Sequence, residues 1–150
     1  MKFRGRFNYA IDPKGRVNVP SPFRETLQDR GQESFFITNF SGCLYAFAAD
    51  DWDRIEEKLS RVPSTDRRKQ AFVRFFLGGA VEAIPDKQGR ILIPPSLREY
   101  AQLDKDVVFQ GIANRFEIWS LERWDEEFGR FEREMQVDPE LAKEISDLGI

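Results

Sequence analysis

Apolar and polar residues alternate in short segments near the start of the chain, and a turn sequence separates the first two segments. Residues 6–11 and 16–19 flank Asp12-Pro13-Lys14-Gly15. An aspartate, a proline and a glycine in this order suit a type I turn whose glycine takes the left-handed bulge position. The pattern predicts a β-hairpin over residues 6–19.

Three further elements follow, and their periodicity alternates between helix and strand. They are a helix from Ser21 to about Gln28, a hairpin of Phe35–Phe40 with Cys43–Phe47, and a helix that carries Trp52, Ile55 and Leu59 on one face. We expect Ser21 to cap the first helix, Gly31 to end it, and Asp50 or Asp51 to cap the second. The predicted order is therefore β-β-α-β-β-α.

The same order recurs because the chain is a tandem repeat. The motif Asp-x-x-x-Arg followed by Pro-x-x-x-Arg-Glu occupies residues 12–25 and returns, 74 positions later, at residues 86–99. Trp52 returns as Trp124, an offset of 72. Residues 64–77 predict a connecting helix, broken by two glycines before the second copy begins near Ala80.

Short hairpins of this kind are marginal alone, so the two copies must share sheets to bury their apolar faces. We expect an α+β fold in which the copies interleave about a pseudo-twofold axis and form a small closed or nearly closed β body with helices outside. The expected half-units are residues 1–62 and 80–150, joined by residues 63–79, and together they make one compact domain.

The amino-acid composition excludes several kinds of catalytic and metal-binding site. The chain has no histidine and a single cysteine, Cys43, which excludes Ser-His-Asp and Cys-His catalysis, the usual zinc sites and an internal disulfide. We therefore expect no enzyme, no cofactor, no metal and no small-molecule substrate. No secretory leader or membrane-spanning stretch is visible, which indicates a cytoplasmic protein. Cys43 lies in a predicted strand, where a buried structural role is favoured.

The net charge of −3 conceals a gradient along the chain. Residues 1–24 carry six basic side chains against one acidic, whereas residues 101–150 carry six basic against thirteen acidic. The acidic run over residues 122–147 predicts a solvated helical face. Beneath it we expect a buried apolar stripe, formed by Trp124, Phe128, Phe131 and Met135.

The basic segment coincides with the first predicted hairpin. If Val17 and Val19 face the core, then Arg16 and Asn18 face outward. Arginine and asparagine are suited to bidentate contacts with guanine and adenine, and a two-stranded ribbon fits the major groove of DNA. Arg90 holds the position of Arg16 in the second copy.

Structural roles for the same residues stay open at this point. Asp12 and Asp86 suit the capping of their turns and the orientation of an arginine. Arg16 and Arg90 are equally suited to clamp a turn. Arg24 and Arg98 also suit ion pairs with acidic neighbours.

The motifs are similar to those of the MraZ family, in the AbrB/SpoVT-like swapped-hairpin group. The resemblance covers essentially the whole chain and rests on Arg4-Gly5, on Asp-x-x-x-Arg twice and on Pro-x-x-x-Arg twice. It implies a nucleoid-associated bacterial transcriptional regulator, expected to be a repressor, of the division and cell-wall gene cluster. It also implies binding to short direct repeats in double-stranded DNA by a ring of identical subunits.

Carried onto this sequence, the family's DNA-contact role falls on Arg16 and Arg90. The charge distribution and strand alternation add further candidates: Lys14, Arg4, Arg6, Arg24 and Asn18. The first hairpin as a whole is basic, whereas the tip of the second carries Asp86-Lys87-Gln88, so equal participation of the two copies is not implied.

Two other classes of protein are alternatives. The first is an AbrB-like antitoxin or interaction module that masks a partner with its C-terminal segment. The second is an enzyme based on carboxylates or lysine, although no such cluster converges in the sequence.

Overall fold

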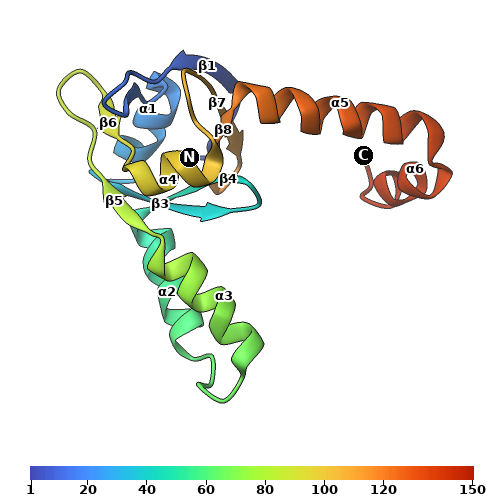
Figure 1. The fold of residues 1–150 in the computed structure, drawn as a ribbon, viewed down its shortest axis with the longest axis horizontal. Coiled ribbons are helices and arrows are strands. Elements are labelled where there is room, and N and C mark those ends of the chain that lie inside the picture. The colour runs from blue at the N-terminus through green and yellow to red at the C-terminus, as the bar shows by residue number, and fades with distance from the viewer. The chain divides into compact units, whose positions relative to one another are not determined.

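The computed structural model describes all residues, 1–150, and divides them into two compact units, Met1–Ser120 and Leu121–Ile150. Fourteen helices and strands follow the chain (Figure 1). In order they are β1 (Arg6–Ala10), β2 (Arg16–Asn18), α1 (Ser21–Asp29), β3 (Phe35–Phe40), β4 (Cys43–Ala48), α2 (Ala49–Ser60), α3 (Arg67–Gly78), β5 (Val81–Ala83), β6 (Arg90–Leu92), α4 (Pro95–Ala101), β7 (Asp106–Ile112), β8 (Arg115–Ser120), α5 (Leu121–Val137) and α6 (Pro139–Ser146). The β-β-α-β-β-α order is confirmed in both copies.

An antiparallel sheet of six strands forms the centre of the first unit, in the order β1-β7-β8-β4-β3-β5. Strands of both copies take part: β1 pairs with β7, β5 pairs with β3, and β4 pairs with β8 between them. The sheet stays open, with β1 and β5 as its edges. The two remaining strands, one from each copy, pair with each other, and we call this pair the β2–β6 ribbon.

The hairpin predicted over residues 6–19 is wrong, although its turn is present. Gly15 donates its backbone N–H to the Asp12 carbonyl at 2.9 Å, and Asp12 donates to Arg16 at 2.9 Å. Beyond these bonds the strands diverge, β1 to β7 and β2 to β6. The reason is burial, because Val17 and Ile91 face each other in the ribbon and are both almost fully buried.

The second predicted hairpin is confirmed, with Phe40 paired to Cys43 across Ser41 and Gly42. Both turn residues have positive φ, 53° and 78°, as a two-residue type I′ turn requires. Cys43 is fully buried, as the strand pattern predicted.

The predicted N-terminal caps are wrong at both α1 and α2, whereas Gly31 ends α1 as predicted, with a φ of 68° and its backbone N–H donating to the carbonyl of Gln28 at 2.9 Å. Helix α1 starts at Ser21 itself after Pro20, and α2 follows Ala48, in neither case with a capping side chain. Asp50 and Asp51 lie inside the first turn of α2, where negative charge also favours a helix N-terminus. There they accept hydrogen bonds from Arg30 at 2.9 and 2.8 Å.

Two hydrophobic clusters lie on opposite faces of β3 and β4. Phe35 and Ile37 of β3 belong to the main core, together with α1, α4 and the ribbon, whereas Phe36 and Phe40 pack on the second cluster. The second cluster is built from α2 and α3, which lie side by side (Figure 1). Trp52 stacks against Phe36 at 5.6 Å between ring centroids, which confirms its predicted core position.

The second unit consists of α5 and α6. Asp138 caps α6, accepting hydrogen bonds from the backbone of Glu140 and Leu141. The prediction of a buried stripe on α5 is wrong, because no residue of α5 is buried and Phe128 and Phe131 are 43% and 44% exposed. Two helices of this size do not enclose such a stripe on all sides.

Candidate nucleic-acid interface

Each copy presents a turn in which an aspartate holds the backbone. Oδ1 of Asp12 accepts the backbone N–H of Lys14 at 3.0 Å and of Arg16 at 2.8 Å. Asp86 does the same for Gln88 and Arg90, at 2.9 Å each. The structural role expected for both aspartates is therefore present.

The same aspartates orient the two arginines. Nε of Arg16 donates to Oδ2 of Asp12 at 2.7 Å, and Nε of Arg90 donates to Oδ2 of Asp86 at 3.2 Å. The backbone hydrogen bond from Arg16 lowers the pKa of Asp12, and the side-chain bond and charge of Arg16 add to the effect. The pKa of Asp86 is lowered in the same way by Arg90. Both carboxylates are therefore ionised at neutral pH and hold the guanidinium groups in a fixed direction.

The register of the β2–β6 ribbon brings both arginines to one face. Arg16 lies opposite Leu92 and Asn18 lies opposite Arg90, with Val17 and Ile91 between them on the inner face. Val17 and Ile91 are buried, while Asn18 and Leu92 are exposed and the arginines are half-exposed. The predicted outward direction of Arg16 and Asn18 is thus confirmed, and Arg90 joins them as a diagonal neighbour.

Arg24 and Arg98 lie beneath the turns rather than in ion pairs. Nε of Arg24 donates to the carbonyl of Val19 at 3.1 Å, and Nε of Arg98 donates to that of Ile93 at 2.9 Å. Each guanidinium packs against the turn glycine of the other copy, Arg24 against Gly89 and Arg98 against Gly15. Each copy thereby supports the turn of the other.

The remaining candidates lie in two places. Lys14 is exposed in the first turn, next to the ribbon, and Asn18 donates to the carbonyl of Gln88 at 3.4 Å. Arg4 and Arg6 lie outside the ribbon, before and on β1, where Nε of Arg6 donates to Gln110 at 3.0 Å. The structure therefore brings together Lys14, Arg16, Asn18 and Arg90, supported from below by Arg24.

Sequence reasoning missed Leu92, which is 58% exposed on the outer face of the ribbon. The offset of 74 residues places it at the position of Asn18, and that comparison is the signal that identifies it. An apolar side chain on this face is suited to contact the methyl group of thymine.

The structure contains no group of three or more metal-ligating side chains arranged to hold an ion. None of its helices combines the length and the apolar character needed to span a bilayer.

These features define a class: a duplicated α+β protein whose two copies jointly present a ribbon with two arginine-bearing turns. A family model described as "MraZ protein, putative antitoxin-like" matches the chain twice, over residues 2–75 and 76–143. The chain belongs to the MraZ family. The two matches lie in tandem, one in each half of the chain.

Curated relatives match between 81% and 99% of this chain. One from Caldanaerobacter subterraneus subsp. tengcongensis is 49% identical over 122 residues, 81% of this chain and 83% of its own length. A relative from Thermoanaerobacter is 43% identical over 97% of this chain and 98% of its own length. A relative from Clostridium tetani is 44% identical over 99% of this chain and 99% of its own length. All three are named "Transcriptional regulator MraZ". That naming agrees with the expectation of a non-enzymatic protein.

Proposed function

We propose that this chain is a cytoplasmic, nucleoid-associated transcriptional regulator that binds double-stranded DNA with the outer face of the β2–β6 ribbon. The observation that carries the proposal is the pair of outward arginines, Arg16 and Arg90, each held by an aspartate of its own turn. A guanidinium fixed in this way loses little freedom when it binds a guanine edge or a phosphate.

The proposed fold arrangement, assembly and DNA target of this chain are those that membership of the MraZ family implies. The pairing of β2 with β6 supports a swapped-hairpin arrangement of the AbrB type, with half-units at residues 1–62 and 80–150. We propose that several copies form a ring, that the ring binds short direct repeats upstream of the division and cell-wall gene cluster, and that binding represses that cluster. Linked weak contacts raise the affinity of such an assembly by about 10²–10⁴ over a single site.

Roles within the interface follow from position. Arg16, Arg90, Asn18 and Lys14 are the proposed direct contacts. Arg24 positions the second turn, and Arg4 and Arg6 are proposed to add phosphate contacts from outside the ribbon, before and on β1. The net charge of −3 does not oppose this function, because charge at the ribbon determines the local field.

The test is fluorescence anisotropy on a duplex that carries the direct repeats, at several salt concentrations. Arg16→Ala is expected to weaken binding and to reduce the slope of log K against log salt by about 0.9 for each phosphate that a subunit no longer neutralises. Arg54→Ala, at an exposed arginine of α2, is the matched control and should bind as the wild type does. An unchanged affinity and slope in a folded Arg16→Ala protein would exclude the ribbon as the DNA-binding surface.

An antitoxin-like interaction module is the second candidate, and the exposed apolar residues of α5 favour it. Antitoxin tails of this group tend to order only on their partner. Hydrogen exchange separates the two functions: strong protection of residues 122–135 without a partner removes the antitoxin interpretation.

A further inference from the structure

The β2–β6 ribbon has an approximate twofold symmetry, because its two strands come from equivalent positions of the repeat. Val17 and Ile91 are 74 residues apart in the sequence and face each other at the centre of the ribbon. Arg16 and Arg90, which flank this central pair, are equivalent in the same way. A half-turn about the centre of the ribbon therefore exchanges the two copies.

The contacts that support the ribbon follow the same symmetry. The backbone N–H of Val19 donates to the carbonyl of Gly89 at 2.8 Å, and the equivalent bond from Ile93 to Gly15 has the same length. Each turn carries one aspartate, one lysine and one arginine, so the formal charges of the two turns are equal as well. Neither the supporting contacts nor the turn charges distinguish one end of the ribbon from the other.

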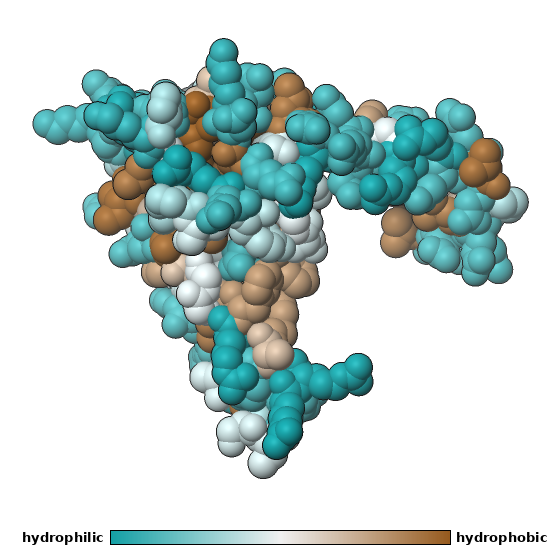
Figure 2. Space-filling view, in the orientation of Figure 1, coloured by the Kyte–Doolittle hydropathy of each residue, from teal (hydrophilic) through white to brown (hydrophobic).

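The outer face of the ribbon breaks this symmetry at one pair of positions. Asn18 of the first copy corresponds to Leu92 of the second, and both side chains are exposed. Nδ2 of Asn18 donates to the carbonyl of Gln88 at 3.4 Å, a bond that a leucine cannot form. One end of the ribbon therefore pairs Arg16 with Leu92, and the other pairs Asn18 with Arg90. Hydrophobic side chains lie among hydrophilic ones on the visible surface around β6 (Figure 2).

The two side chains suit different chemical groups in the major groove of DNA. Asparagine forms two hydrogen bonds with the edge of adenine, whereas an apolar side chain contacts the methyl group of thymine. The bond to Gln88 uses one amide hydrogen of Asn18 and leaves the other, with the carbonyl oxygen, for adenine. A symmetric protein surface matches a palindromic DNA site, and this surface is asymmetric at the position that reads bases.

We propose that Asn18 and Leu92 determine the direction in which the ribbon lies on the duplex. The ribbon of one subunit reads a non-palindromic site, with an adenine at Asn18 and a thymine at Leu92. The inference rests on the proposed DNA-binding function and adds the residues that give the site its direction. Arg16 and Arg90 supply affinity but no direction, because each is held by the aspartate of its own turn in the same way.

The first experiment selects binding sequences from a pool of duplexes with a random window of about ten base pairs, one turn of the double helix. The wild type should yield a non-palindromic consensus. Leu92→Asn should yield a palindrome with adenine at both equivalent positions, and Asn18→Leu one with thymine at both. Circular dichroism verifies the fold of each variant. A palindromic consensus for the wild type, or a wild-type consensus for both variants, would overturn the proposal.

The second experiment removes the methyl group from the DNA. Each thymine of the selected duplex is replaced by uracil in turn, and at one position the wild type should bind about fourfold more weakly, the effect of burying one methyl group. Leu92→Ala should bind the thymine and uracil forms of that position equally. A ratio that persists in Leu92→Ala, or no sensitive position for the wild type, contradicts the role of Leu92.

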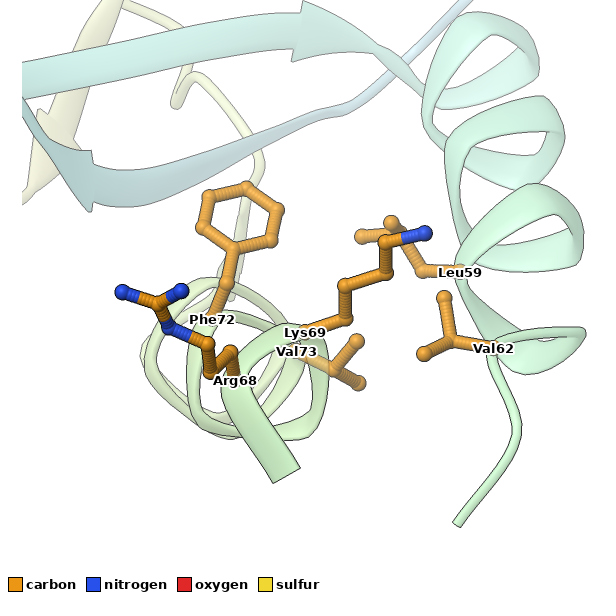
Figure 3. Close-up of a pocket in the computed structure, with 6 residues that line it drawn as sticks. All are labelled: Leu59, Val62, Arg68, Lys69, Phe72 and Val73. Carbon is orange, nitrogen blue, oxygen red and sulfur yellow. The ribbon is translucent and has the colours of Figure 1, made fainter. Parts of the chain in front are cut away.

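Val73→Ala is the matched control for Leu92→Ala, because it also shortens an aliphatic side chain. Val73 lies in a groove between α2 and α3, across from Val62 (Figure 3). The groove and the ribbon lie on opposite faces of β3 and β4. Val73→Ala should therefore keep the wild-type ratio of affinities for thymine and uracil, and loss of the ratio in this variant would contradict a specific contact at Leu92.

The third experiment observes the direction itself. Lys87→Cys places an iron–EDTA label on the second turn, and Cys43 does not compete for the label because it is fully buried. Within the selected site, cleavage should fall on one side of the centre, and adding Leu92→Asn should produce cleavage on both sides of a symmetric site. Because Arg4 and Arg6 remain in that variant, cleavage confined to one side would show that charge outside the ribbon sets the direction, against the proposal.

The same measurements separate this inference from the proposed function. If the wild type enriches no sequence and binds duplex DNA no better than Arg16→Ala does, the DNA-binding proposal fails. If the wild type enriches a consensus that Leu92→Asn and Asn18→Leu leave unchanged, DNA binding stands and the role of these two residues is excluded.

Discussion

Arg24 of the first copy lies directly beneath Gly89 in the turn of the second copy. A Cβ atom at Gly89 would come within 2.7 Å of the guanidinium carbon of Arg24. The same turn is tied to the first copy by a hydrogen bond from the N–H of Val19 to the carbonyl of Gly89, at 2.8 Å. The turn that carries Arg90 is thus positioned by the first copy of the repeat.

Gly89→Ala is expected to destabilise the protein by about 1–3 kcal/mol, since the residue has a φ of 80° and meets Arg24. Gly31→Ala is the matched control, because Gly31 has a φ of 68° but nothing within 4 Å of a Cβ. Gly31→Ala should lower the free energy of unfolding only by the cost of placing a side chain at a positive φ, about 1 kcal/mol. Urea unfolding of both variants measures the difference, and equal losses would show that the contact with Arg24 adds nothing.

Arg24→Ala is expected to lower DNA affinity without changing the salt dependence of binding. The side chain holds the carbonyl of Val19 and supports Gly89, so its loss misplaces Arg90 rather than removing a phosphate contact. Arg16→Ala, by contrast, should reduce the salt slope. Anisotropy titrations at three or more salt concentrations decide between the roles: a reduced slope for Arg24→Ala identifies it as a direct DNA contact.

The local elements of this fold and the pairing of β3 with β4 were predictable from the sequence, whereas the partners of β1 and β2 were not. Turn residues identified the Asp12–Gly15 turn, but turn chemistry extends over four residues and does not determine whether the strands beyond it stay together. Here β2 pairs with β6, 74 residues away in the repeat, because that pairing buries Val17 and Ile91.

In the candidate site, too, the local features were predictable from the sequence, and the contacts between the two copies were not. Strand alternation alone gave the outward direction of Arg16, whereas the place of Arg24 beneath Gly89 depends on a contact between the copies. The stripe on α5 was predicted to be buried, but amphipathicity does not determine whether another surface covers it, and no residue of α5 is buried.

Phe76→Ala is expected to destabilise the α2–α3 pair by about 3–5 kcal/mol, the usual cost of removing a buried phenylalanine. Phe76 is 6% exposed and packs on Trp52, at 5.6 Å between ring centroids. Because this cluster lies outside the main core, hydrogen exchange should accelerate in α2 and α3 while the amides of β7 and β8 keep their protection. Uniform acceleration over the whole chain would instead indicate one cooperative unit.

Replacing both turn aspartates, Asp12→Asn with Asp86→Asn, tests the pH dependence of the turns. Both carboxyl groups have pKa values below the ordinary 3.8 in the folded protein, first because of the backbone hydrogen bonds of Arg16 and Arg90. A lowered folded-state pKa stabilises the fold above the unfolded pKa, and this stabilisation is lost as the pH falls through the folded value. The wild type should therefore exceed the double variant in thermal stability by a constant margin from about pH 7 to pH 5, and the margin should shrink below about pH 4. Other carboxylates, Asp51 included, are present in both proteins and cancel in the comparison. Since asparagine retains an oxygen that accepts the backbone N–H groups, the margin isolates the charge, and a margin that persists unchanged at pH 2 would rule out ionisation as its source.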